Sequence, residues 1–366
     1  MNQSRFLTLA AVACLYTANA FAQTATTRIV SAANAFLASL DDNQRKSVLF
    51  SYSDEEQRKR WSNLPVSIVP RAGLSFKDLN ASQQAAGLAL LKTALSVRGF
   101  EKVQQIMEAD EVLKGDQGNG RGGAPPQGPP GNPPGARGGR GGRGPGGGLM
   151  FGKDLYFFSI LGTPSVKEPW MLQFGGHHLA LNITIDGERG ILTPTLTGAQ
   201  PALYTLNGKT YRPLAGESDK GLALLNSLDE GQRKQAILSF RMADLVLGPG
   251  QDGKTIQPEG LKVSAMTEKQ KTMVLDVVSE WTGIVHDSAA ARRMAQLKAE
   301  INDMWFAWSG PIEPAASGNI AAYYRIQGPH LVIEYAPQSM GGDASLHVHT
   351  MYRDPTNDYG RNPAVR

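Results

Sequence analysis

The chain has 366 residues, of which 41% are hydrophobic, and a formal net charge of +4 at pH 7. This length and apolar fraction are sufficient for a globular protein with a sizeable core, which excludes a wholly disordered chain. The single cysteine, Cys14, lies within the N-terminal leader described next. The predicted mature chain therefore has no cysteine, which excludes disulfides, thiolate metal sites and a cysteine nucleophile.

Residues 1–22 have the pattern of a secretory signal peptide. Arg5 lies in a short polar start, an apolar run covers residues 6–16, and Ala20-Phe21-Ala22 precedes Gln23. The run is too short to cross a bilayer, so we expect no transmembrane segment. The pattern predicts a periplasmic or secreted protein.

Most of the remaining chain occurs twice. The motif Leu-Asp-x-x-Gln-Arg-Lys at residues 40–46 returns at residues 228–234, an offset of about 187 residues. Farther on, Phe-x-Gly-x-His-Leu at residues 174–179 matches Ile-x-Gly-x-His-Leu at residues 326–331, and the offset has fallen to 152. We therefore predict two pseudo-repeats, residues 23–200 and 201–366, with an insert of about 35 residues in the first copy only.

The insert covers residues 115–148 and consists almost wholly of Gly, Pro and Arg. We expect it to be disordered, because it cannot bury enough apolar surface to offset its chain entropy. Its arginines carry the whole basic excess of the mature chain, which would suggest a nucleic-acid partner. However, the insert has no aromatic residue to stack on a base, and an exported protein rarely meets RNA, so we predict no nucleic-acid binding.

Local signals place helices before strands in each copy. An N-cap residue three positions before a glutamine marks four helix starts: Asp41, Asn80, Asp229 and Thr267. Short runs rich in aromatic and branched residues follow at 155–161, 170–174, 179–185, 323–326 and 331–335, and the connections between them are too short for crossover helices. Asn207-Gly208 predicts a tight hairpin. The fold class is α+β: two pseudo-repeated halves, each with helices followed by antiparallel strands, whose sheets join at a pseudo-twofold axis.

The second copy carries a histidine pair that the first lacks. At the 152-residue offset, His347 and His349 correspond to Thr195 and Thr197. On an extended strand, residues two apart project to the same face, so these two imidazoles can bind one ion. The scaffold is duplicated, whereas this chemistry is not.

A metal site needs further ligands, and the first copy offers them at residues 177 and 178. We predict His178 as the third ligand, with His177 as its substitute, since neighbours on a strand point to opposite faces. Three neutral imidazoles and an open position suit Zn, Cu or Fe, for hydrolytic or oxidative chemistry. Asp354 or Asp358 would act as the catalytic carboxylate, either as a metal ligand, as the general base or as a group that orients a ligand. The competing interpretation is a cluster of histidines that hydrogen-bond for structural reasons only.

The segment from Arg353 to Gly360 also has two interpretations. Its Asp, Asn, Pro and Gly residues are typical of turns. Alternatively, Arg353 and Tyr359 are substrate-binding residues. The Arg353 guanidinium would then form a bidentate pair with a substrate carboxylate or phosphate, and Tyr359 would donate a hydrogen bond. Both interpretations stay open at this point.

Two motifs carry a resemblance to a known family: Gly-His-His-Leu at residues 176–179, and His-x-His-x-x-Tyr-Arg-Asp-Pro-x-Asn-Asp-Tyr-Gly at residues 347–360. The chain resembles a family of secreted bacterial and fungal proteins described only as a domain of unknown function. The resemblance covers roughly residues 28–360, and the insert is the main departure. It implies no activity, substrate or cofactor.

Two functions from different classes follow from the residues themselves. One is an exported metalloenzyme with a histidine-ligated ion. The other is a non-catalytic periplasmic protein that binds a small molecule or an envelope component through its aromatic-rich strands. The unduplicated His347 and His349 favour the first, and the absence of a complete ligand set in the sequence favours the second.

Overall fold

The structure is a computed structural model that describes residues 24–118, 149–339 and 342–362. The predicted signal peptide and nearly all of the predicted insert lie outside these ranges. Within them, no helix has both the length and the apolar character that a membrane span requires.

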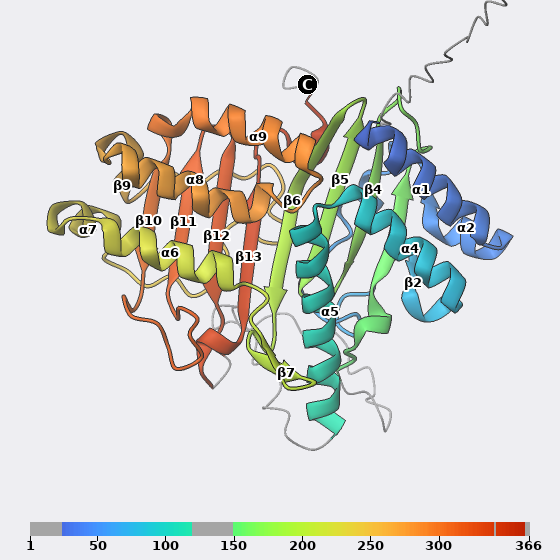
Figure 1. The fold of residues 1–366 in the computed structure, drawn as a ribbon, viewed down its shortest axis with the longest axis horizontal. Coiled ribbons are helices and arrows are strands. Elements are labelled where there is room, and N and C mark those ends of the chain that lie inside the picture. The colour runs from blue at the N-terminus through green and yellow to red at the C-terminus, as the bar shows by residue number, and fades with distance from the viewer. Residues whose placement is uncertain (1–23, 119–148, 340–341, 363–366) are drawn as a thin grey trace, which may run out of the picture.

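One large sheet of 11 strands runs through the molecule, and the long helices lie on one of its faces (Figure 1). The strand order is β1-β3-β4-β5-β6-β13-β12-β11-β10-β9, with β2 paired to β3. All pairs are antiparallel except β1 with β3. The predicted α+β class is confirmed.

The first half contains helices α1 (Ala25–Ser39), α2 (Asp42–Val48), α3 (Glu55–Lys59), α4 (Ala81–Ala94) and α5 (Val97–Gly118), and strands β1 (Leu49–Phe50), β2 (Leu74–Ser75), β3 (Phe157–Leu161), β4 (Trp170–Gly176), β5 (Leu179–Asp186) and β6 (Arg189–Ala199). The second half contains helices α6 (Ala215–Ser227), α7 (Glu230–Ala236), α8 (Glu268–Thr282) and α9 (Asp287–Ala299), and strands β9 (Leu261–Lys262), β10 (Trp305–Ser309), β11 (Tyr323–Gly328), β12 (Leu331–Pro337) and β13 (Val348–Arg353). Between the halves lies the hairpin β7 (Tyr204–Leu206) and β8 (Lys209–Tyr211), as Asn207-Gly208 predicted.

All four predicted helix starts form complete capping boxes. Asp41, Asn80, Asp229 and Thr267 each accept a hydrogen bond from the backbone of the glutamine three residues on, and each glutamine side chain accepts one in return. Each box satisfies donors that a helix N-terminus otherwise leaves without partners. The matching boxes at equivalent helices are the clearest local trace of the duplication.

A pseudo-twofold axis passes between β6 and β13, the two central strands. Tyr352 pairs with Thr195 there, and in the helix layer Leu95 pairs with its counterpart Val285. Leu181 on β5 pairs with Thr195, and its counterpart Ile333 on β12 pairs with Tyr352. Thr195 therefore corresponds to Tyr352, and the sequence offset that aligned Thr195 with His347 does not hold on these strands. The reason is the connection: β5 and β6 form a tight hairpin, whereas ten residues separate β12 from β13.

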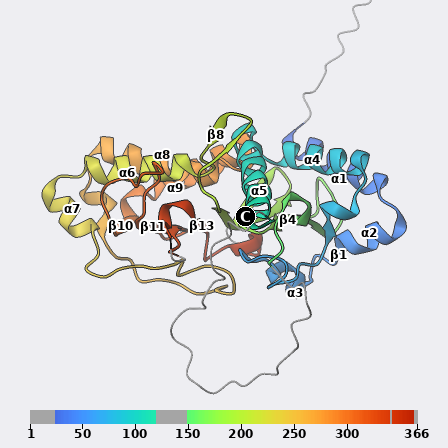
Figure 2. The ribbon, with the colours of Figure 1, turned by 90° about the horizontal axis from the view of Figure 1, so that it is seen from below.

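Each face of the sheet is covered differently. The helices enclose two apolar cores against the front face, one per half, around Trp170 and Trp281 respectively. Two long segments, residues 51–73 and 238–260, cross the back face (Figure 2). They are held by polar contacts: Gln57 bonds Ser159 and Gln173, and the backbone N–H groups of Val246 and Leu247 donate to Glu334.

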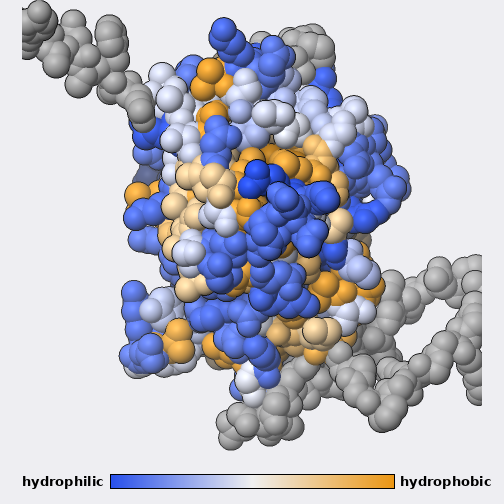
Figure 3. Space-filling view, turned by 90° about the vertical axis from the view of Figure 1, so that its right-hand side faces the viewer, coloured by the Kyte–Doolittle hydropathy of each residue, from blue (hydrophilic) through white to orange (hydrophobic). Residues whose placement is uncertain are grey.

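The outer side of the first half is largely hydrophilic, with smaller hydrophobic areas between the polar side chains (Figure 3). This is the ordinary surface of amphipathic elements that bury one face only. The groups with distinctive chemistry lie instead near the centre of the sheet, where the two halves meet.

Candidate metal centre

Two histidines of the site come from the start of β13. His347 directly precedes the strand and His349 is its second residue, so their side chains both face the back of the sheet. On the neighbouring strand β6, the residue opposite His349 is Gly198. Its missing side chain leaves space over the back face at this point.

The third histidine fills that space. His178 lies in the turn between β4 and β5, with a left-handed backbone φ of 61°. Its N–H donates to the carbonyl oxygen of Asn63, 3.2 Å away, which ties the turn to the back-face segment. A side chain at position 198 would lie 3.2 Å from His178 Cδ2 and 3.3 Å from its Cβ. Glycine at position 198 therefore lets the His178 ring lie over β6.

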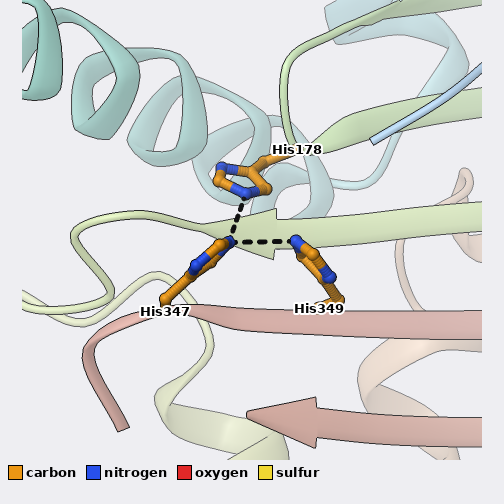
Figure 4. Close-up of side chains that lie close together, drawn as sticks. All are labelled: His178, His347 and His349. Atoms are coloured by element: carbon orange, nitrogen blue, oxygen red, sulfur yellow. Dashed lines mark hydrogen bonds between the residues drawn. The ribbon is translucent and has the colours of Figure 1, made fainter. Parts of the chain in front are cut away.

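The three imidazoles converge through their Nε2 atoms (Figure 4). His178 Nε2 lies 2.9 Å from His347 Nε2, which lies 3.1 Å from His349 Nε2. Candidate ligand atoms of all three residues lie within 4.8 Å of one another. Two nitrogens bound to one tetrahedral ion at about 2.0–2.1 Å lie roughly 3.3 Å apart, so small side-chain adjustments would seat an ion here.

The surroundings favour neutral imidazoles. His178, His347 and His349 are 2%, 9% and 6% exposed. Burial, together with the neighbouring histidines, lowers the pKa of His178 well below its usual value and lowers that of His347 to about 2. Metal ions bind the neutral form, so protons compete weakly for the nitrogens of His178 and His347.

Hydrogen bonding alone does not satisfy this arrangement. One ring nitrogen of a neutral imidazole carries the proton and the other carries one in-plane lone pair. His347 Nε2 can therefore take part in one good hydrogen bond. Two atoms lie within hydrogen-bond distance of it, however: His178 Nε2 and His349 Nε2. A cation among the three atoms accepts a lone pair from each, which resolves the conflict.

The back-face segments of both halves supply polar groups around His349. Asn63 Nδ2 lies 3.4 Å from both of its ring nitrogens. Asp244 Oδ1 lies 3.8 Å from His349 Nδ1. A carboxylate near the far nitrogen orients a metal-binding imidazole and favours the tautomer that leaves Nε2 free. His347 Nδ1 is buried and finds no hydrogen-bond partner within the described ranges.

His177, the predicted substitute ligand, is held elsewhere. Its Nδ1 lies 2.6 Å from Asp110 Oδ1 on α5, and its ring packs between Phe151 and the ring of His178. In the second half His330 bonds Glu300 in a similar way. The histidine that holds a strand end against the preceding helix is thus His177 in one copy and His330 in the other, which leaves His178 to face the pair on β13.

The predicted catalytic and substrate-binding residues lie apart from the three imidazoles. Arg353 is four residues beyond His349, about 13 Å along the strand, and its guanidinium bonds Asp252 and Asp358. Tyr359 also bonds Asp252. Asp354 forms an ion pair with Arg293 at 3.1 Å. These roles stay predictions, and the contacts favour the turn interpretation, because each group already has an internal partner.

Sequence reasoning missed several residues around the site. Gly198, Asn63 and Asp244 lie in loops or strands without a local motif. Asp110 had a signal: the apolar stripe of Val103, Ile106 and Met107 on α5 continues to this charged residue, which is only 2% exposed. A carboxylate on a buried helix face indicates a partner, here His177.

The fold and this cluster define a class: an α+β protein with an internal duplication and a buried group of three histidines at the join. The chain belongs to the family described as protein of unknown function (DUF3500), whose model matches residues 22–361. Comparisons with curated proteins and with solved structures gave no match.

Proposed function

We propose that this protein binds one transition-metal ion through the Nε2 atoms of His178, His347 and His349. The observation that carries the proposal is the convergence of two imidazole nitrogens on His347 Nε2, at 2.9 and 3.1 Å. No placement of protons on the three neutral rings gives His347 Nε2 a good hydrogen bond to both neighbours. A cation, in contrast, accepts a lone pair from each of the three nitrogens.

The donor set favours Zn or Cu over Fe. Imidazole nitrogen suits all three metals, but the common non-haem iron site adds a carboxylate to two histidines. The nearest carboxylate here, Asp244, lies on the far nitrogen of His349 rather than among the Nε2 atoms. Three histidines with a free fourth position are typical of a zinc that activates water, and a copper ion would support redox chemistry.

The first candidate function is therefore an exported metalloenzyme that uses the ion in hydrolysis or oxidation. Its export rests on the signal-like residues 1–22 and on the lack of cysteine beyond Cys14. The second candidate is a non-catalytic envelope protein in which the ion joins the two halves. Burial of all three imidazoles favours this second candidate, since a catalytic ion must admit a substrate.

Metal analysis tests the binding itself. Protein exported by its own leader and purified without a polyhistidine tag is expected to contain close to one equivalent of metal. Replacing His347 and His349 together by alanine is expected to remove the metal and to leave the helical circular dichroism unchanged. The matched control is His330→Ala, because His330 is paired with a carboxylate away from the cluster. Stoichiometric metal in the double variant would refute the proposal.

Cobalt substitution separates the two candidates. Tetrahedral Co(II) absorbs visible light, and an open fourth position changes this spectrum when azide or cyanide binds. A spectral change supports the metalloenzyme. A spectrum that anions leave unaltered supports the ion as a structural link between the halves.

A further inference from the structure

A second site lies on the opposite face of the sheet, at the pseudo-twofold axis. A cavity of about 140 Å³ lies between α9 and the central strands β6 and β13. Tyr352, which lines it, points to the helix face, whereas His347 and His349 point to the back face. The cavity is therefore separated from the histidine cluster by the sheet.

The inner wall of this cavity is apolar. Leu192, Val285 and Ala289 line it and are almost wholly buried, and Ile191 adds a partly buried edge. A dry space of about 150 Å³ is known to hold a ring of six carbons. The volume thus fits a small ring or a short chain.

The mouth of the cavity is cationic. Arg189, Arg292 and Arg293 line it, against one carboxylate, Asp354. Asp354 is already committed, since it pairs with Arg293 and accepts hydrogen bonds from Thr356. Arg292 is exposed, and one of its N–H groups donates to the carbonyl oxygen of Glu188. Arg189 is paired with Asp186 and Arg293 with Asp354, so the positive charge left at the mouth is that of Arg292.

Tyr352 supplies a directed donor between the mouth and the apolar wall. Its hydroxyl oxygen accepts a hydrogen bond of 2.9 Å from Arg293 Nε. Its own proton finds no acceptor within the described ranges. Arg293 is in turn held by Gln296 and Asp354, so the hydroxyl has a fixed position. A buried O–H fixed by an arginine is suited to an anionic oxygen.

We propose that this cavity binds a small monocarboxylate, aromatic or short-chain aliphatic, with its apolar body against Val285 and Ala289. The carboxylate accepts hydrogen bonds from the Tyr352 hydroxyl and from Arg292. The site was not apparent in the sequence, which suggested Arg353 for such a role. The two terminal nitrogens of Arg353 bond Asp358 and Asp252, and Arg353 does not line this cavity.

Fluorine NMR of para-fluorobenzoate tests the proposal on the full mature chain. We expect binding in the millimolar range or tighter, and binding of the neutral para-fluorobenzamide that is about tenfold weaker, because hydrogen bonds to a charged acceptor are the stronger ones. Tyr352→Phe and Arg292→Gln are each expected to weaken benzoate binding several-fold. Lys298→Gln is the matched control for Arg292→Gln, since Lys298 is an exposed cation on the same helix that does not line the cavity.

A filling variant tests the position independently of the polar groups. Ala289→Met is expected to abolish binding, whereas Ala291→Met, an exposed position on the same helix, is expected to leave it unchanged. Equal binding of acid and amide, unaltered binding in Ala289→Met, or no binding of the acid would each overturn the proposal. Metal content does not enter these measurements, so their outcome is independent of the histidine cluster.

Discussion

At the scale of single residues, two adjacent histidines do different work because of one backbone torsion. His178 adopts a left-handed φ of 61°, and its ring lies over β6 while it still packs against the ring of His177. His177 remains against α5, bonded to Asp110. Residues other than glycine rarely adopt this conformation, and they do so where surrounding contacts enforce it. Here the hydrogen bond to Asn63 helps to do so.

Gly198→Ala is expected to weaken metal binding at least tenfold. The added carbon would lie 2.8 Å from the carbonyl oxygen of Val348 and 3.2 Å from His178 Cδ2, so the His178 ring must move. Overpacking of this kind typically costs about 1–3 kcal/mol of stability as well. Metal titration and denaturant unfolding measure the two effects. Gly115→Ala is the control, because nothing lies within 4 Å of its added carbon; equal metal affinity in both variants would contradict the prediction.

Asp358 is expected to make the stability pH-dependent. Burial raises its pKa from 3.8 to about 6, although Arg353 opposes the shift. A raised carboxyl pKa stabilises the folded state below the unfolded pKa, and this contribution is lost as pH rises through about 6. The wild type should therefore lose up to about 3 kcal/mol relative to Asp358→Asn between pH 4 and pH 7. Denaturant unfolding at both pH values measures the difference, and a constant difference would rule out the raised pKa.

At the scale of elements, the duplicated capping boxes allow a paired experiment. Asp41 and Asp229 cap α2 and α7, and their glutamine partners bond Gln83 at the start of α4 and Gln270 at the start of α8. Removing an N-cap typically costs about 0.5–2 kcal/mol. We expect Asp41→Ala and Asp229→Ala to destabilise the protein by amounts within about 0.5 kcal/mol of each other. Thermal unfolding measures this, and a large effect in one copy only would show that the boxes are not equivalent.

At the scale of the whole molecule, we expect the chain to tolerate loss of residues 119–147. The flanking parts of the chain are held together, since the backbone N–H of Gly152 donates to Asp110 Oδ2 and that of Lys153 to Glu111 Oε2. Shortening the loop between these flanking parts changes its closure entropy little. The deletion should shift the Tm by no more than a few degrees. A loss above about 10 °C would show that the segment contributes to the packed structure.

The sequence by itself determined the parts of the protein that depend on neighbouring residues. The four capping boxes, the strand runs and the Asn207-Gly208 hairpin are local hydrogen-bond patterns, so their signals lie within a few residues. The predicted duplication rests on signals of the same kind, because equivalent elements keep equivalent local patterns. His347 and His349 were found on the same grounds, since a period of two places them on one face.

Only the tertiary structure decided which distant groups meet. His178 and His347 are 169 residues apart in the chain, and their contact depends on the strand order, the left-handed turn and the missing side chain at Gly198. The same holds for Asp110 with His177, and for the arginines of α9 around Tyr352. Local propensities carry no information on such contacts. The distances between these side chains depend on how the two halves pack across β6 and β13.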